Sequence, residues 1–535
     1  MDFKDASRLI DKTTFFSSLF LLLGVTIPLL IRPEAGGVIV NQIRRFLTDV
    51  LGTWYLALGL GAFIFMVYIV FSDFGKIKLG EPDEKPEFGD FAWISMLFCA
   101  GIGASIVYWG PIEWAFYYQS PPFMIEPESV EAMRWASTYG MYHWGPVAWS
   151  IYLIPAVPIA YFYHVRKKHV LKLSRAVAPV IGTTAARGWP GKIIDVLFIF
   201  GMLGGGATSL GLAAPLINEG LFRLFEVPRG IWPQILILLV CTAIFGASAY
   251  SGLKKGIQRL STLNVAIALG LLVYVFLVGP TTFITESSFE AVGRLASNFI
   301  QMSTWLEPFG GMNGYEDTSF PADWTIFYWA WWLAFAPTVG IFIARISKGR
   351  TIANMVGGSL VWGSLGCALF FMILGNFGSF LQLSGQLDVI SILNNDSAEA
   401  AIFSILNELP FGWIVTAVFT FLALIFLATT FDSISYILAS AVQTHVDDEP
   451  MRWNRLFWAA MLSLMPVSLM FLGGLNTVQT ASIVGGAPLL IIAVLLCWSI
   501  LIVARRDLHK HSTFEPSQIN IDVPKENIDP WNKED

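Results

Sequence analysis

The feature that most constrains this chain is the recurrence of long apolar runs with few or no charged residues. A transmembrane helix needs about 20 predominantly apolar residues, and runs of that length recur along nearly all of the 535 residues. Only 13% of the residues are charged and 55% are hydrophobic, whereas soluble domains carry about 25% charged residues. We therefore predict an all-α polytopic membrane protein. A soluble enzyme, a disulfide scaffold and a nucleic-acid binder are excluded.

Stretches without charge predict twelve membrane-spanning helices. Basic residues before the first stretch resemble the start of a signal peptide, but the stretch is long and lacks a small-residue cleavage site, so we expect an uncleaved first span. The predicted spans are residues 14–32, 52–72, 90–119, 137–163, 193–221, 232–251, 261–280, 324–345, 354–381, 411–440, 456–474 and 477–503.

Positive charge predicts the orientation of these spans. Seven Lys and Arg residues lie between spans four and five, in residues 166–192, whereas residues 382–410 between spans nine and ten contain none. Lys and Arg concentrate in cytoplasmic loops, so we expect both termini on the cytoplasmic side of the membrane. Arg32, Arg44 and Arg45 are exceptions, because this orientation places them outside.

Several predicted spans contain residues that interrupt helices. Glycines recur in residues 99–103 of span three and in residues 201–211 of span five, and Pro337 lies within span eight. Transporters break helices near the middle of the membrane to free backbone groups for ligands and ions. Glycines also let intact helices pack closely, but three interrupted spans in one chain favour a transporter.

Two predicted spans carry clustered aromatic side chains that helical periodicity places on common faces. Tryptophan often lies at the membrane interface, which fits Trp324, but Trp331 and Trp332 lie about seven residues deeper in span eight. Converging aromatic rings suit a quaternary ammonium group, which has no N–H to donate and binds to π faces. The residues are Trp144, Trp149 and Tyr152 in span four, and Trp331, Trp332, Phe335 and Phe342 in span eight.

Span ten contains adjacent polar residues, Thr429, Thr430 and Asp432, in an otherwise apolar helix. Polar groups within a membrane helix are costly and often functional. Hydroxyl oxygens can bind a small hard cation, and Thr208 and Ser209 in span five offer similar groups. The alternative is that these hydroxyls donate to carbonyl groups of their own helix. For the three residues together we favour a cation site.

Three segments resemble signatures of the betaine/choline/carnitine transporter family. They are residues 141–152, 327–332 and 342–350, and the resemblance extends over residues 10–505. It implies a leucine-transporter-like core of two inverted five-helix repeats, formed by spans three to twelve, and a homotrimer. The implied parts are a cytoplasmic N-terminus (1–13), two peripheral helices (14–75), a first repeat (90–280), an amphipathic interfacial helix (284–310), a second repeat (324–503) and a cytoplasmic tail (504–535).

The resemblance also implies roles for individual residues. An aromatic box would consist of Trp144, Trp149, Tyr152 and Trp332, and the inner path would be lined by Trp331, Phe335 and Phe342. Sodium-coupled relatives imply one Na+ site at Cys99, Ile102, Phe426, Thr429 and Thr430. A second Na+ site would use Thr208, but Gly204 stands where a hydroxyl is expected one turn earlier.

These features predict a secondary transporter, not an enzyme, that imports a zwitterionic betaine such as glycine betaine or carnitine by sodium symport, without a cofactor. Choline carriers of the family tend to have an aspartate where this chain has Ser105, which favours a zwitterion over choline. One alternative is an ion-independent carnitine/γ-butyrobetaine exchanger. Another is a proton-coupled choline or betaine carrier.

Overall fold

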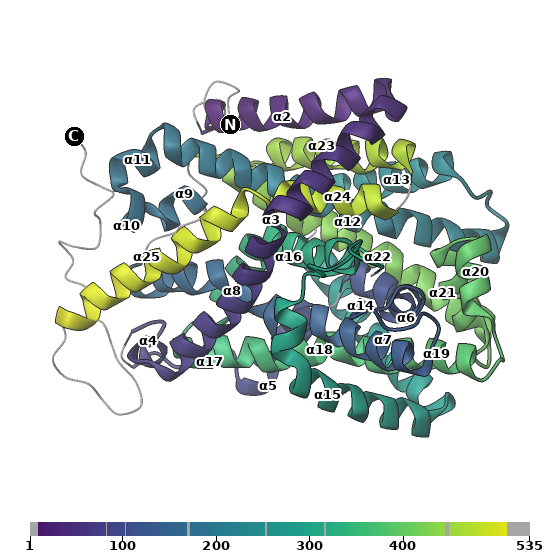
Figure 1. Cartoon of the computed structure of the whole chain (residues 1–535). Helices are drawn as coiled ribbons and strands as arrows, with labels where there is room; N and C mark the ends of the chain where they lie inside the picture. Colours follow the sequence, from purple (N-terminus) through teal and green to yellow (C-terminus); the bar gives the residue numbers. More distant parts are fainter. Residues whose placement is uncertain are drawn as a thin grey trace.

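The chain folds into a bundle of helices (Figure 1). This computed structural model describes residues 9–510 except residues 82, 102, 168–171, 252–253, 315–316, 445–448 and 474. Across this part of the chain the β structure consists of two isolated bridges, Ile10 with Gln443 and Lys78 with Thr351. The prediction of an all-α protein is therefore confirmed.

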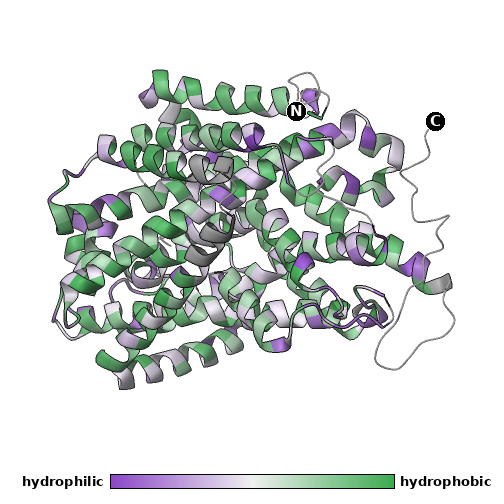
Figure 2. Ribbon diagram, turned by 180° about the vertical axis from the view of Figure 1, so that it is seen from behind, coloured by the Kyte–Doolittle hydropathy of each residue, from purple (hydrophilic) through white to green (hydrophobic). Residues whose placement is uncertain are grey.

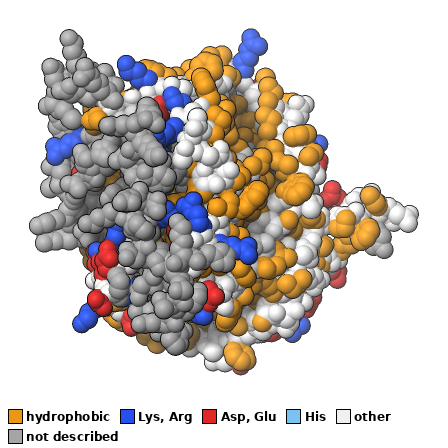
Figure 3. All heavy atoms as spheres, turned by 90° about the vertical axis from the view of Figure 1, so that its left-hand side faces the viewer, with side chains coloured by type: hydrophobic (Ala, Val, Ile, Leu, Met, Phe, Trp, Pro, Cys, Tyr) orange, Lys and Arg blue, Asp and Glu red, His pale blue; other side chains and the backbone are white. Residues whose placement is uncertain are grey.

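The exterior of the bundle is strongly apolar. Phe20, Trp232 and Ile491, from helices far apart in the sequence, are 79%, 71% and 70% exposed. Hydrophobic residues run along most helices in Figure 2, and hydrophobic side chains cover much of the visible face in Figure 3. Of the described helices, nine are long and apolar enough to cross a membrane, or eleven if each of two bent pairs is one span. The protein is a multi-pass membrane protein, and the count of twelve spans stays a prediction.

Two helices at the N-terminus pack on the outside of the bundle. Helix α2 (Lys12–Ile31) begins where the Asp11 carboxylate accepts the main-chain N–H of Thr14 at 3.2 Å. Helix α3 (Pro33–Phe71) is 39 residues long, so it begins well before the predicted second span. Arg44 lies in this added part, is buried, and binds Asp323 at 2.6 Å. This ion pair explains one exception to the charge pattern, because Arg44 is not a free loop residue.

The predicted break in span three is confirmed. Helix α5 (Asp90–Ala100) and helix α6 (Ala104–Gln119) meet at an angle of 62°. Span four is also divided, which the sequence did not indicate. Helix α7 (Val130–His143) ends before Trp144, and helix α8 (Pro146–Ala160) starts with a proline in its first turn. The π-helix η1 (Tyr161–Val165) continues α8.

The predicted break in span five is wrong. Helix α12 (Trp189–Phe225) runs without interruption through the glycine-rich residues 201–211. These glycines serve close packing instead, because a Cβ atom at Gly204 would collide with the carbonyl oxygen of Ala481 on helix α24 (Leu475–Gly486). Small residues of this kind let two membrane helices approach each other.

The amphipathic segment forms a helix of its own. Helix α13 (Ile231–Ser251) is followed by helix α14 (Lys254–Val278) and helix α15 (Thr281–Thr304), and the last two meet at 110°. Phe289 on α15 is 83% exposed, although Ile284 and Ala291 are buried. The helix ends six residues before the predicted boundary at 310, and its position at a membrane interface stays a prediction.

The predicted interruption of span eight is also wrong. After η2 (Pro321–Thr325), helix α16 (Ile326–Ile346) continues through Pro337. A proline removes one helical hydrogen bond, but packing against neighbouring helices can keep a membrane helix continuous. Here α16 packs on α8, α24 and α12, and Gly340 lies against the backbone of Ala156. Helix α16 is thus the central element around which the site is built.

The remaining helices complete the bundle. The predicted span twelve is divided after Gly486, where α24 ends and α25 (Leu489–Lys510) begins. Span nine is a chain of short α and π segments. These and the other elements are α4 (Asp73–Lys76), α9 (Leu173–Ala176), α10 (Ala178–Ile181), α11 (Thr183–Arg187), α17 (Ile352–Gly358), η3 (Ser359–Gly363), α18 (Ser364–Phe370), η4 (Phe371–Gly375), α19 (Asn376–Leu383), α20 (Val389–Asn395), α21 (Ala398–Asn407), α22 (Gly412–Ala441) and α23 (Arg452–Leu472).

Candidate functional site

A cavity of about 140 Å³ lies where the break between α5 and α6 meets α12, α16 and α22. A larger hollow of about 480 Å³ lies between α15 and residues 369–373, but its lining is almost wholly apolar. Specific sites combine apolar walls with a few polar groups, so the smaller cavity is the candidate. Its lining consists of Ala100, Gly101, Gly103, Ala104, Ser105, Ile106, Trp144, Tyr152, Ser209, Trp331, Trp332, Phe335, Val339 and Thr430.

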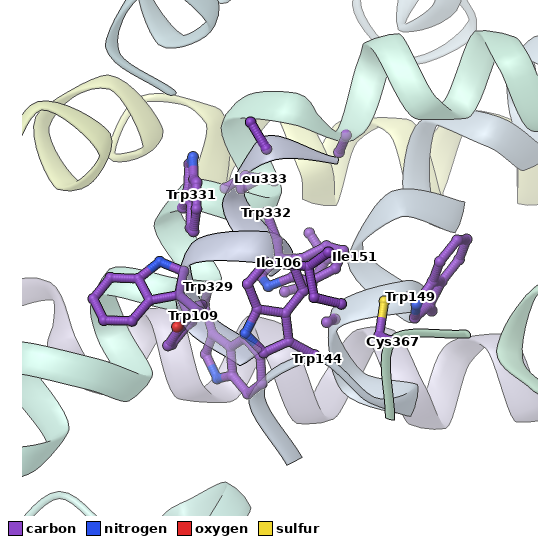
Figure 4. Packing of buried hydrophobic residues seen from close by; sticks show 14 of the residues in the cluster. Ile106, Trp109, Trp144, Trp149, Ile151, Trp329, Trp331, Trp332, Leu333 and Cys367 are labelled. Atoms are coloured by element: carbon purple, nitrogen blue, oxygen red, sulfur yellow. The ribbon is translucent and has the colours of Figure 1, made fainter. Parts of the chain in front are cut away.

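Aromatic rings form adjoining walls of this cavity. The Trp144 and Trp332 ring centroids are 5.3 Å apart with 81° between the ring planes, and Trp144 and Trp331 are 6.0 Å apart at 84°. Tyr152 lies 4.5 Å from Trp332. These distances and angles are those of edge-to-face contacts between neighbouring rings, and Figure 4 shows the tryptophans from close by. Because each of these rings also lines the cavity, the cavity wall is aromatic, and aromatic rings can bind a cationic headgroup.

Two predicted aromatic residues do not line the cavity. Trp149 stands beside Cys367 (Figure 4) and contacts the cavity wall from behind, with its ring 5.7 Å from Tyr152 and 6.5 Å from Trp332. Phe342 lies two turns beyond Phe335 on α16 and is 38% exposed. The structure therefore brings together five of the seven predicted aromatic side chains and places Trp149 as their support.

Polar groups lie at the other side of the cavity. Ser105, near the start of α6, donates a hydrogen bond to Ser209 on α12 at 3.2 Å, and both side chains line the cavity. The first main-chain N–H groups of a helix have no partner within it, and Ala104 to Ile106 form the first turn of α6 here. The sequence grouped Ser209 with the cation ligands, but the structure places its side chain on the wall of the aromatic cavity, in contact with Ser105.

The hydroxyl groups of α22 that were predicted to bind a cation have partners within their own helix. The hydroxyls of Thr429 and Thr430 both donate to the carbonyl oxygen of Phe426, at 3.0 and 2.8 Å. Thr430 also lines the cavity beside Ala100, one residue after Cys99, which is itself half-buried. Ile102 lies outside the described residues. The two hydroxyls thus make the hydrogen bonds within their own helix that the alternative predicted, and the cation site stays a prediction.

Asp432 is not a free carboxylate for a cation. It forms an ion pair with Arg455 of α23, which accounts for its presence in an apolar helix. Thr208, the candidate for a second Na+ site, has its hydroxyl 2.8 Å from the carbonyl oxygen of Val478 and 2.8 Å from the hydroxyl of Ser482. Two of its oxygen neighbours are thus supplied by α24, and a third is the main-chain carbonyl of Gly204 on α12, at 3.2 Å.

A buried carboxylate, Glu113, also contacts the aromatic residues around the cavity. This carboxylate is fully buried and accepts hydrogen bonds from Tyr117 at 2.5 Å, from the Trp144 indole at 3.2 Å, and from Tyr328. The spacing of Glu113 and Tyr117, four residues apart on one helix, could have indicated the first of these contacts. The other two join helices far apart in the sequence.

Together, a multi-pass helical bundle and a small aromatic cavity at a helix break define the class of membrane transporters. The chain belongs to the betaine/carnitine/choline transporter family, because residues 13–509 match the model of this family. The family resemblance inferred from the three sequence segments is therefore confirmed.

Relatives of this chain are named as transporters of different substrates. It is 34% identical to a carnitine transporter of Acinetobacter baumannii over 84% of this chain and 80% of that protein. It is 37% identical to the glycine betaine transporter OpuD of Bacillus subtilis, over 88% and 90% of the two chains. It is 34% identical to an ectoine/hydroxyectoine transporter of Virgibacillus pantothenticus, over 90% and 93%.

Proposed function

We propose that this protein imports a zwitterionic betaine, such as glycine betaine or carnitine, across a bacterial inner membrane by Na+ symport. The observation that carries the proposal is a set of four aromatic side chains on the cavity wall, Trp144, Tyr152, Trp331 and Trp332. We call these four residues the aromatic box, in which Trp331 takes the place predicted for Trp149. A trimethylammonium group is surrounded by methyl groups and cannot donate an N–H, so aromatic faces are its natural partners. The named relatives for glycine betaine and carnitine support the same substrate class.

The other half of the zwitterion needs hydrogen-bond donors. The Ser105 and Ser209 hydroxyls and the first turn of α6 offer them, and the N-terminus of a helix favours negative charge. The indole N–H of Trp332 is buried, and no partner for it exists among the described residues. A substrate with a cation at one end and a carboxylate at the other fits these two walls.

The coupling ion would bind next to the substrate, between α5 and α22. Oxygen atoms of Thr429 and Thr430 and main-chain carbonyls around Cys99, Ile102 and Phe426 would coordinate Na+, with Thr208 as a possible ligand at a second position. An ion there would tie the broken span to α22, and movement of the bundle would then expose the cavity to each side alternately. We also propose cytoplasmic termini and a homotrimer, with α15 between protomers.

Reconstitution tests this function directly. Purified protein in liposomes should accumulate labelled glycine betaine or carnitine when an inward Na+ gradient is imposed. Equal gradients of K+ and of protons are the controls for coupling, and liposomes without protein are the control for leak. Accumulation with no gradient, provided that a second betaine is trapped inside, would instead identify an exchanger. Failure to move any of these betaines would refute the proposed substrate class.

Trp332→Ala should weaken betaine binding by about 1–2 kcal/mol, or about 5–30-fold in affinity, because it removes one π face from the box. Trp332→Phe keeps a smaller face and should lose less. Equilibrium binding of labelled glycine betaine to the purified variants measures both effects. Unchanged affinity in both variants would remove Trp332 from the substrate site.

Ser105→Asp should raise the ratio of choline uptake to betaine uptake. The new carboxylate would lie in the cavity near the start of α6, where it attracts a net cation and repels the carboxylate of a betaine. Ser105→Ala is the matched control, since it removes the bond to Ser209 without adding charge. A ratio that stays constant in correctly folded Ser105→Asp protein would show that the substrate does not approach this position.

A further inference from the structure

A carboxylate lies directly behind the aromatic box. Glu113 on α6 is fully buried, and its side chain is held by groups from two helices and from the break between α7 and α8. Tyr117 of α6 donates to one carboxylate oxygen at 2.5 Å. Tyr328 of α16 and the indole of Trp144, which follows α7, donate to the other oxygen, the indole at 3.2 Å.

A chain of hydrogen bonds leads from Thr325 through His143 and Tyr117 to Glu113. His143 Nδ1 lies 2.8 Å from the Tyr117 hydroxyl, and His143 Nε2 lies 3.1 Å from the Thr325 hydroxyl. Since the Tyr117 proton goes to Glu113, the Tyr117 oxygen accepts from Nδ1, and Nε2 accepts from Thr325. A neutral imidazole satisfies both contacts. Glu113 thus accepts three hydrogen bonds, which its two carboxylate oxygens can accommodate.

No cationic side chain balances this carboxylate in the described part of the protein. Glu113 forms no ion pair there with Lys or Arg, and its one basic neighbour is His143, whose Nδ1 lies 3.9 Å away. Two other buried carboxylates are paired with arginines: Glu219 binds Arg223 and Arg229, and Asp507 binds Arg166. Asp195 is instead held by the N–H and hydroxyl of Ser174, outside the cavity. A buried charge without a partner is costly, so the position of Glu113 calls for a functional reason.

Trp144 connects Glu113 to the cavity. Its indole N–H reaches the carboxylate, and its ring lines the cavity opposite Trp332. A permanently charged substrate headgroup in the box would be separated from Glu113 by little more than this ring. Two opposite charges at such a distance in protein attract each other appreciably.

We propose that Glu113 is a positioning residue that determines specificity for a cationic headgroup. Its carboxylate fixes the orientation of Trp144 and, through the indole N–H, adds negative charge to the ring face that meets the substrate. The inference rests on the proposed function and extends it, because it names the negative charge that balances the trimethylammonium group. Tyr117 and Tyr328 hold the carboxylate in place.

The test is a double-mutant cycle between positions 113 and 144. Labelled glycine betaine and labelled carnitine are the probes, and the measured quantity is the dissociation constant of the purified full-length protein. Glu113→Gln keeps an acceptor of nearly the same shape but removes the charge, and should weaken binding about tenfold. Trp144→Phe keeps a ring but removes the N–H, and should weaken binding about threefold by itself. Because Glu113 acts through Trp144, Glu113→Gln should then cost less than about threefold in the Phe background.

Asp195→Asn is the matched control. Asp195 is also a buried carboxylate, but it binds the N–H and hydroxyl of Ser174 outside the cavity, so this variant should bind as the wild type does. Equal losses for Glu113→Gln in both backgrounds would mean that Glu113 does not act through Trp144, and wild-type affinity in Glu113→Gln would mean that its charge is irrelevant. Either result overturns the inference. If Glu113→Gln does not fold, unchanged binding in Trp144→Phe overturns it. Wild-type protein that binds neither probe refutes the proposed function itself.

Discussion

Asp507→Ala should lower the free energy of unfolding by about 3–5 kcal/mol, the usual cost of breaking a buried ion pair. Asp507 near the end of α25 binds the Arg166 guanidinium at 2.5 Å and also accepts the Tyr161 hydroxyl at 2.5 Å. Both charged side chains are 5% exposed. Removing the carboxylate leaves the guanidinium buried without its acceptor, and α25 loses its attachment to the C-terminal end of the predicted span four.

The measurement is the thermal stability of the purified protein in detergent. It is expressed as the temperature at which half of the protein remains monodisperse. Asp73→Ala is the control, because Asp73 pairs with Lys76 on the surface, with side chains 59% and 44% exposed, and such pairs contribute about 0.2–1 kcal/mol. Replacing both Arg166 and Asp507 with apolar residues of similar size should recover part of the lost stability. Equal effects of Asp507→Ala and Asp73→Ala would show that water reaches Asp507.

How far the sequence predicts this fold depends on the kind of feature. Hydrophobic runs located the helices, because burial in lipid requires long apolar segments. Helix breaks were harder to predict, because glycines occur both at breaks and where two intact helices pack closely. The glycines of residues 99–103 accompany a real break, whereas Gly204 lies in a continuous helix against the backbone of Ala481. Only the position of the neighbouring helix distinguishes the two cases.

The site was predictable in composition but not in detail. The periodicity argument for Trp144, Trp149 and Tyr152 assumed one regular helix. The structure ends α7 at His143 and restarts at Pro146, so the angular relation between Trp144 and the later residues changes. Tyr152 consequently lines the cavity, and Trp149 packs behind it. A break of two residues is too local for hydrophobic periodicity to detect.

Partners of polar residues were the least predictable part. Asp432 looked like a cation ligand beside two hydroxyls, but Arg455, on the following helix, neutralises it. Nothing in the sequence connected Glu113 with the aromatic residues, but its carboxylate accepts hydrogen bonds from Trp144 and Tyr328. Such pairings depend on which helix faces meet, and that is a property of tertiary packing.

Removing the two adjacent hydroxyls of α22 should abolish the effect of Na+ on substrate affinity. If Thr429 and Thr430 coordinate Na+, the Thr429→Ala/Thr430→Ala protein leaves the ion short of oxygen ligands, and the break between α5 and α6 loses its link to α22. The improvement in affinity that Na+ causes is a coupling free energy between two sites, so it vanishes when one site is lost. Binding independent of Na+ should persist, because the aromatic box of Trp144 and Trp332 is intact.

Substrate affinity in Na+ and in K+ at constant ionic strength, followed by tryptophan fluorescence of the purified protein, decides the matter. Thr420→Ala is the control on the same helix, because its hydroxyl donates to the Thr416 carbonyl at 2.8 Å, as the two predicted ligands do to Phe426, but lies outside the cavity lining. It should keep the full response to Na+. If the substrate affinity of the double variant still responds to Na+, the ion binds at another site. Equal wild-type affinities in the two salts would reject symport and favour an ion-independent exchanger, in which the double substitution acts through packing alone.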